Sequence, residues 1–222
     1  EDLRQVLSHS CRLGVLVDFG VIVSKEVIDY FPLGIINSHF SLLPEWRGAD
    51  PITFAVLSGQ AKTGVSLMLL AEKMDTGKLI AQKALRIKPG TTTPGLTDEL
   101  ISLSNKLLLE YLPDYISGKI KPKAQPLKNG ATYSRRLTKA DGNIDWAKTA
   151  QQIERQIRAF LGWPGSRTTI AGKEVIILKA SVAKIDSDKQ PGQAFVHNKN
   201  LAIKCADHCL VISKLKPAGK NE

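Results

Sequence analysis

Polar residues in the first half of the chain have types and spacing that suit chemistry at a carbonyl group. Asn37 and His39 stand two residues apart at the end of the apolar run 34–37, so an extended backbone would present both side chains on one face. A carboxamide donor beside an imidazole can stabilise negative charge on a carbonyl oxygen and can move a proton. A histidine that merely caps the end of a strand fits the same pattern, so that alternative stays open.

Asp75 is a third candidate, in the turn sequence Met74-Asp75-Thr76-Gly77 that follows the apolar stretch 63–71. An Asp-Thr-Gly triplet also occurs in aspartic proteases, but those sites need two paired carboxylates, and this sequence has one such triplet. An aspartic protease is therefore excluded. A lone Asp in this triplet is usually a turn former.

The segments around these residues alternate between strand-like and helix-like patterns. Strands are predicted at residues 14–18, 34–37, 63–71 and 78–87. Helices, one of them with a leucine stripe at helical spacing, are predicted at residues 24–28, 51–57 and 97–115. The alternation predicts an α/β domain with a largely parallel sheet. Such sheets bind ligands at the carboxyl ends of their strands, which is where Asn37 and His39 lie.

The second half of the chain has a different pattern. Residues 118–130 contain two prolines and several lysines without periodicity, which predicts an extended linker between a domain at 1–117 and a domain at 131–222. One helix is predicted at 149–160. Short strands are predicted at residues 168–170, 174–181, 193–196, 201–205 and 210–215. Strands of this length, broken by Gly, Asn and Asp, predict a small β-barrel.

Positive charge is concentrated in this second half. The chain has a formal net charge of +10, yet residues 1–118 hold 11 basic and 13 acidic side chains, a net of −2. Residues 119–222 hold 20 basic and 8 acidic side chains, a net of +12. A charge of this density favours a polyanionic partner, most commonly nucleic acid, over a merely solubilising surface.

Membrane insertion, disulfide bonding and metal binding find little support in the sequence. No stretch reaches the 18 or more apolar residues of a membrane span, and no secretory signal is evident. The three cysteines, Cys11, Cys205 and Cys209, form no disulfide framework and fit a reducing, cytoplasmic setting. His197, His208 and the last two cysteines could suggest zinc, but no second Cys pair exists and a hairpin turn explains their spacing, so no metal is predicted.

The segments that carry the candidate chemistry resemble the signature of folate-dependent formyltransferases. They are Asn37-Ser38-His39-Phe40-Ser41-Leu42-Leu43-Pro44, Trp46-Arg47-Gly48 and Met74-Asp75-Thr76-Gly77. The second half resembles the methionyl-tRNA formyltransferases within that family. Its matching segments are Ile144-Asp145-Trp146, Ile157-Arg158-Ala159-Phe160, Trp163-Pro164-Gly165 and Lys216-Pro217-Ala218-Gly219-Lys220.

The resemblance implies a function and a set of site residues. Asn37, His39 and Asp75 would be catalytic, and the segment Ser41, Leu42, Leu43 and Pro44 would bind tetrahydrofolate. The implied reaction transfers the formyl group of the co-substrate 10-formyltetrahydrofolate to the α-amine of initiator methionyl-tRNA. Asn37 and protonated His39 would hold the oxyanion while Asp75 orients His39, with no metal.

The resemblance also implies an architecture, a partial Rossmann-like domain followed by a basic, OB-like tRNA-binding domain. Family members carry a longer amino-terminal part, so the chain is expected to be incomplete at that end. Formylation of a small amine, either glycinamide ribonucleotide or a nucleotide amino sugar, is one alternative, although a +12 second half has no obvious use there. An inactive RNA-binding module is another. No obligate protein partner is predicted.

Overall fold

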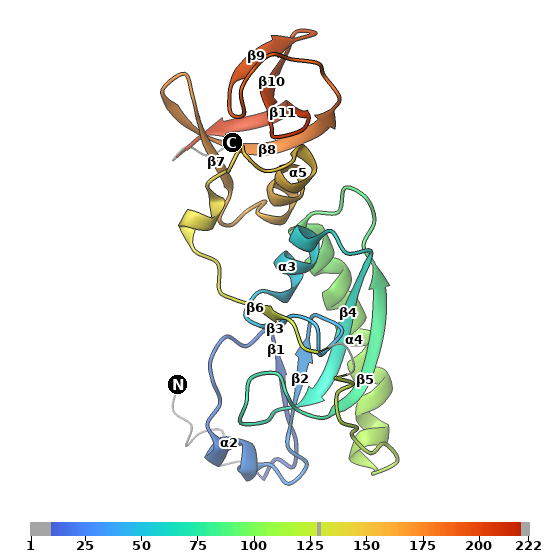
Figure 1. Ribbon diagram of the computed structural model, residues 1–222. Coiled ribbons are helices and arrows are strands. Elements are labelled where there is room, and N and C mark those ends of the chain that lie inside the picture. Colours follow the sequence, from blue (N-terminus) through green and yellow to red (C-terminus); the bar gives the residue numbers. More distant parts are fainter. Residues whose placement is uncertain (1–9, 128–129, 219–222) are drawn as a thin grey trace. The chain divides into compact units, whose positions relative to one another are not determined.

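A computed structural model describes residues 10–127 and 130–218 of the chain (Figure 1). The chain folds into two compact units, which are described separately below. The first comprises residues 1–52, 61–87 and 97–136, and the second comprises residues 53–60, 88–96 and 137–222, apart from the undescribed positions. Gly219 and Lys220 of the carboxyl-terminal motif, and residues 128–129 of the predicted linker, lie outside the described residues.

The first unit contains a four-stranded sheet in the order β1-β2-β4-β5. Its strands are β1 (Gly14–Val17), β2 (Ile35–His39), β4 (Lys62–Leu69) and β5 (Leu79–Arg86). β1 pairs with β2 in parallel, whereas the β2–β4 and β4–β5 pairs are antiparallel. The sheet is therefore mixed, and the prediction of a largely parallel sheet is wrong. The loop 70–78 is too short for the crossover of about 10 to 12 residues that would keep β5 parallel to β4.

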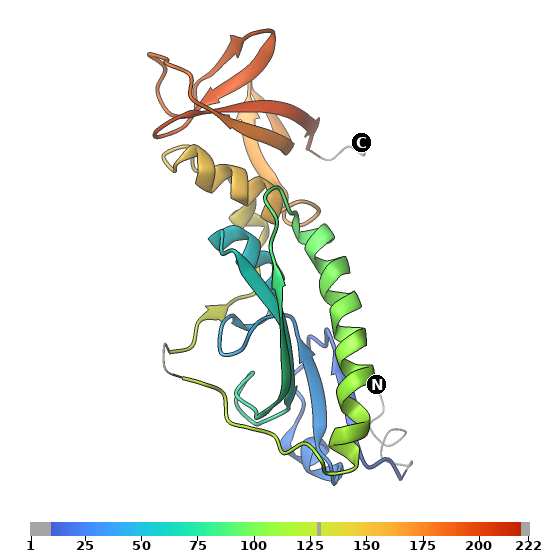
Figure 2. The same ribbon diagram turned by 90° about the vertical axis from the view of Figure 1, so that its right-hand side faces the viewer.

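Helices form at the predicted positions, as α2 (Lys25–Tyr30), α3 (Pro51–Ser58) and α4 (Thr93–Ile116). Helix α4 runs along the sheet of the first unit, which both views show (Figures 1 and 2). Leu100 and Leu107 of the predicted stripe are buried, and Ser104 Oγ lies 2.7 Å from Ser38 Oγ of β2. The α/β character of this half is thus confirmed. None of the described helices has the length and apolar composition of a membrane span.

The second unit contains a five-stranded antiparallel sheet in the order β7-β8-β11-β10-β9. Its strands are β7 (Ser166–Ile170), β8 (Lys173–Ala183), β9 (Ala194–His197), β10 (Asn200–Lys204) and β11 (Cys209–Pro217). Within the described residues β9 and β7 do not pair, so the sheet is open and the predicted barrel closure is wrong. The physical reason is that a helix already covers the apolar face.

That helix is α5 (Ala150–Ala159). It begins at Thr149, whose side chain and that of Gln152 form a capping box, which satisfies backbone donors at the helix start. Ile153 and Ile157 of α5 form one buried cluster with side chains of β8, β10 and β11. The helix and one open sheet therefore bury a core without a closed barrel.

Replacing Leu100 with Ala tests the packing of α4. Leu100 is 0% exposed, so Leu100→Ala should lower the free energy of unfolding by about 2 to 5 kcal/mol, through lost burial and the cavity left behind. The matched control is Leu109→Ala in the same helix, where the side chain is 80% exposed and the change should stay within about 0.5 kcal/mol. Urea denaturation measures both, and equal effects would contradict the packing described here.

Candidate active site

Strand β2 places Asn37 and His39 on the same face of the first sheet. Ser38, between them, points to the opposite face, where it meets Ser104 of α4. His39 is 6% exposed, and Asn37 is half-buried. Within the described part of the chain the Asn37 carboxamide makes no hydrogen bond, which leaves its N–H groups available to a ligand.

The imidazole of His39 is held by the backbone of the following loop. Its Nε2 lies 2.9 Å from the carbonyl oxygen of Trp46. Because a carbonyl oxygen can only accept, Nε2 carries the hydrogen and Nδ1 is the nitrogen that gains or loses a proton. Nδ1 faces the Asp75 carboxylate, with 3.8 Å between Nδ1 and Oδ1. The structure therefore brings His39 and Asp75 together.

Asp75 is fixed by a second contact. It lies in the loop between β4 and β5 with a left-handed backbone, φ +51°. Its Oδ2 accepts a hydrogen bond of 2.7 Å from the backbone N–H of Gly48, which leaves Oδ1 turned toward His39. Gly48 has φ +115°, and a Cβ there would come 2.0 Å from the carbonyl oxygen of Ser134, so only glycine fits.

Burial and charge act in opposite directions on His39. Removal from water disfavours the charged imidazolium and lowers the pKa of His39, and this is the larger effect. The negative charge of Asp75 and the carbonyl of Trp46 partly oppose it. The resting imidazole is therefore neutral near pH 7, with an acceptor at Nδ1 beside a carboxylate.

The segment predicted to bind folate is held against β4 and β5 by two polar side chains that sequence reasoning missed. Ser66 Oγ donates to the Ser41 carbonyl at 2.6 Å and accepts from the Leu43 backbone N–H at 3.0 Å. Gln82 Nε2 donates to the Leu43 carbonyl at 2.8 Å. Ser41 and Leu43 are buried, and a cis peptide joins Leu43 to Pro44. A polar serine within the apolar run 65–68 was the signal available in the sequence.

A segment from much later in the chain completes this wall of the site. Strand β3 (Arg47–Gly48) pairs in parallel with β6 (Tyr133–Ser134). The backbone N–H of Trp46 donates to Thr132 Oγ1 at 2.8 Å, next to the carbonyl that holds His39. Nothing in the sequence pattern indicated this pairing, because two-residue strands carry no periodicity.

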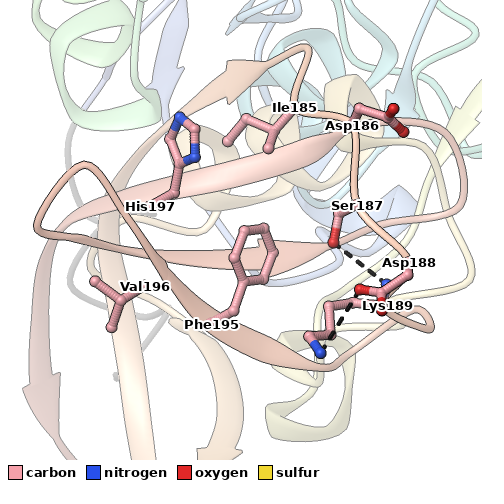
Figure 3. Close-up of a pocket in the computed structure, with 8 residues that line it drawn as sticks. All are labelled: Ile185, Asp186, Ser187, Asp188, Lys189, Phe195, Val196 and His197. Carbon is pink, nitrogen blue, oxygen red and sulfur yellow. Dashed lines mark hydrogen bonds and ion pairs between the residues drawn. The ribbon is translucent and has the colours of Figure 1, made fainter.

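The described residues elsewhere offer no comparable constellation. In that part of the chain no three His, Cys, Asp or Glu side chains are grouped as metal ligands. Cys205 and Cys209 are both buried, and burial raises the pKa of the Cys205 thiol to about 12. An open cavity of about 500 Å³ in the second unit is lined by residues 185–189 and 195–197 (Figure 3). It holds two carboxylates and one lysine, and no predicted site residue lines it.

Comparison with known proteins gives consistent matches. Residues 1–112 match the family described as formyl transferase, and residues 136–222 match its C-terminal domain. The methionyl-tRNA formyltransferase of Roseiflexus castenholzii is 39% identical over 209 residues, which are 94% of this chain and 66% of that protein. The chain thus spans just under two thirds of that relative's length.

Two solved structures share the fold. HypX from Aquifex aeolicus, in complex with tetrahydrofolic acid, has a TM-score of 0.72 and 19% identity, over 94% of this chain and 36% of that chain. The N-formyltransferase from Helicobacter canadensis, in complex with folinic acid and dTDP-3-aminofucose, has a TM-score of 0.69 and 22% identity, over 87% of this chain and 70% of that chain.

The buried histidine should make stability depend on pH. Because the pKa of His39 is lowered from 6.5 on folding, the unfolded chain binds the proton more readily. The free energy of unfolding should therefore fall as the pH drops below about 6.5, by at most about 1.4 kcal/mol per pH unit, and level off below the folded-state pKa. In the His39→Gln protein the free energy of unfolding should depend less on pH than in the wild type. Urea denaturation at a series of pH values between about 8 and 5 measures this difference.

The control for this experiment is His197→Gln, the same substitution at a half-buried histidine of the second unit. It should keep the wild-type slope. If His39→Gln leaves the slope unchanged, His39 is not the buried neutral imidazole described here.

Proposed function

Because the chain belongs to the formyl transferase family, we propose that it transfers the formyl group of 10-formyltetrahydrofolate to the α-amine of initiator methionyl-tRNA. The observation that carries the proposal is the His39–Asp75 pair, on the same sheet face as an Asn37 carboxamide that has no other partner among the described residues. Formyl transfer needs these two capacities, a donor for the developing oxyanion and a group that accepts a proton from the attacking amine.

In the proposed reaction the α-amine attacks the formyl carbon. A new C–N bond forms, and Asn37 donates a hydrogen bond to the oxygen as it becomes negative. The attacking nitrogen must then lose a proton. Nδ1 of the neutral His39 accepts it, and the resulting imidazolium is stabilised by Asp75, 3.8 Å away. When the bond from the formyl carbon to the folate nitrogen breaks, His39 returns the proton to that nitrogen.

Burial of His39 favours a different role from the oxyanion contact first expected for its protonated form. To hold the oxyanion as an imidazolium, His39 would have to be protonated before the amine attacks the formyl carbon. Burial instead lowers the pKa of His39 and favours the neutral form. Neutral His39 suits a general base. Oxyanion stabilisation is therefore assigned to Asn37. His39 becomes charged only when it accepts the proton from the attacking amine.

Tetrahydrofolate is proposed to bind along the segment 41–44. The hydrogen bonds from Ser66 and Gln82 hold this segment in one conformation before a ligand arrives, which reduces the entropy that binding would otherwise cost. The side chains of Ser41 and Leu43 are buried, so contact with the ligand would be made by the half-buried Leu42 and by backbone.

Initiator methionyl-tRNA is proposed as the acceptor because of the charge distribution. The net charge of +12 on residues 119–222 attracts a polyanion and has no evident use for a small amino sugar or ribonucleotide. Phosphate contacts from this half would position the acceptor end without reading its sequence.

Removing either polar group of the proposed site should abolish most of the activity. Asn37→Ala and His39→Ala should each lower the rate of formyl transfer by about two to four orders of magnitude, because one removes the oxyanion donor and the other the base. The assay follows formylation of methionyl-tRNA by the full chain. His208→Ala, a histidine of the β10–β11 hairpin, is the control and should retain wild-type activity. A fully active His39→Ala protein would contradict the assignment.

Binding of tRNA to the full chain should depend steeply on salt. Each phosphate neutralised by a basic side chain releases counterions, so the affinity should fall about a hundredfold or more between about 50 and 200 mM salt. Filter binding over a salt series, with initiator and elongator tRNA, measures the slope. If the affinity for tRNA did not change with the salt concentration, residues 119–222 would not bind tRNA through its phosphate groups.

A further inference from the structure

Gln125 lies in the segment predicted as a linker, yet its side chain is buried at the proposed active site, at 8% exposure. Its Oε1 accepts hydrogen bonds from Arg47, at 2.6 Å from Nη2 and 3.3 Å from Nε. Its Nε2 donates to the backbone carbonyls of Asp75, at 2.8 Å, and Gly77, at 2.9 Å. Every hydrogen-bonding group of this carboxamide is therefore used, and two of its partners belong to the turn that carries Asp75.

We propose that Gln125 is a positioning residue that fixes the Asp75 carboxylate against His39. The proposal rests on the proposed function only in so far as Asp75 assists His39 in catalysis. The positioning itself can be measured without any turnover.

The Asp75 turn is held at two points. The N–H of Gly48 fixes the carboxylate through Oδ2, and Gln125 fixes the peptide backbone through two carbonyl groups. Arg47 precedes Gly48 in β3 and binds Gln125, so both points belong to one connected set of contacts. Release of the backbone contact would let the turn, and Oδ1 with it, move away from Nδ1.

The charge of Arg47 strengthens this connection. Arg47 is buried, and among the described residues no carboxylate forms an ion pair with it, so its guanidinium is bound by the carboxamide oxygen of Gln125. A hydrogen bond from a guanidinium is stronger than a neutral one and polarises the acceptor amide, which makes its N–H groups better donors. A residue that served only to fill space would need none of these contacts.

The test uses Gln125→Met, which keeps a similar size and removes both the donors and the acceptor. The titration of the His39 imidazole is followed by NMR in the full chain, with His39→Gln identifying the signal. Asp75 is the charged group that faces His39, and Arg47 is the charged group that contacts Gln125. Since Asp75 raises the pKa of His39, its displacement should lower that pKa further. The kcat of formyl transfer should fall about 10- to 100-fold with a smaller change in KM.

Gln156→Met is the matched control. Gln156 is 5% exposed and also donates to two backbone carbonyls, those of Gly142 and Asn143, at 3.4 Å each, but in the second unit. Its replacement should leave the His39 titration at the wild-type value. In an Asp75→Asn background, Gln125→Met should cause no further shift, because the charge through which Gln125 acts is already gone.

Two results would overturn the proposal. One is a folded Gln125→Met protein with the wild-type His39 titration, and the other is a shift of the same size in the Asp75→Asn background. If Gln125→Met does not fold, Gln125→Asn, which keeps a carboxamide one methylene shorter, should shift the titration in the same direction. A wild-type chain without formyl transfer would refute the proposed function, while the titration would still decide the role of Gln125.

Discussion

The placement of a neutral imidazole beside a carboxylate, both largely removed from water, is the constraint on which the rest of the site depends. Burying these groups costs free energy unless each polar atom finds a partner. The Trp46 carbonyl accepts a hydrogen bond from Nε2 of His39, and the Gly48 N–H donates one to Oδ2 of Asp75. Both partners are backbone groups of residues only two positions apart, so the loop that follows β2 has to adopt one conformation to make both contacts.

That conformation uses backbone geometries that few residues tolerate. Trp46 has φ +54° and Gly48 has φ +115°, and the loop is tied to Thr132 and Ser134 on its outer side. On its inner side, Ser66 and Gln82 hold residues 41–43. Contacts on both sides over-determine the loop, which is how strained backbone persists at a functional site.

The sequence allowed the prediction of the elements and of the residues with chemical potential, but not of their supports. Helices and strands were found because their periodicity extends over several residues, as in α4. The directions of the strands were not predicted correctly, since strand patterns do not encode them, and the short loop between β4 and β5 fixes the direction of β5 alone. The approach of Asp75 to His39 was expected only from resemblance. Gln125 was assigned to a linker because an isolated polar residue among prolines and lysines has no pattern that signals burial.

The pairing of β3 with β6 makes the site dependent on the order in which the chain is made. Trp46 and Thr132 are separated by 86 positions, and helix α4 lies between them in the sequence. A nascent chain would therefore expose Asn37, His39 and Asp75 well before residues 130–134 leave the ribosome to brace the loop. Contacts of such long sequence separation form late in folding, because the entropy of closing the intervening loop must be overcome first. Asn37, His39 and Asp75 would thus be synthesised well before the long-range contacts that organise the loop around them can form.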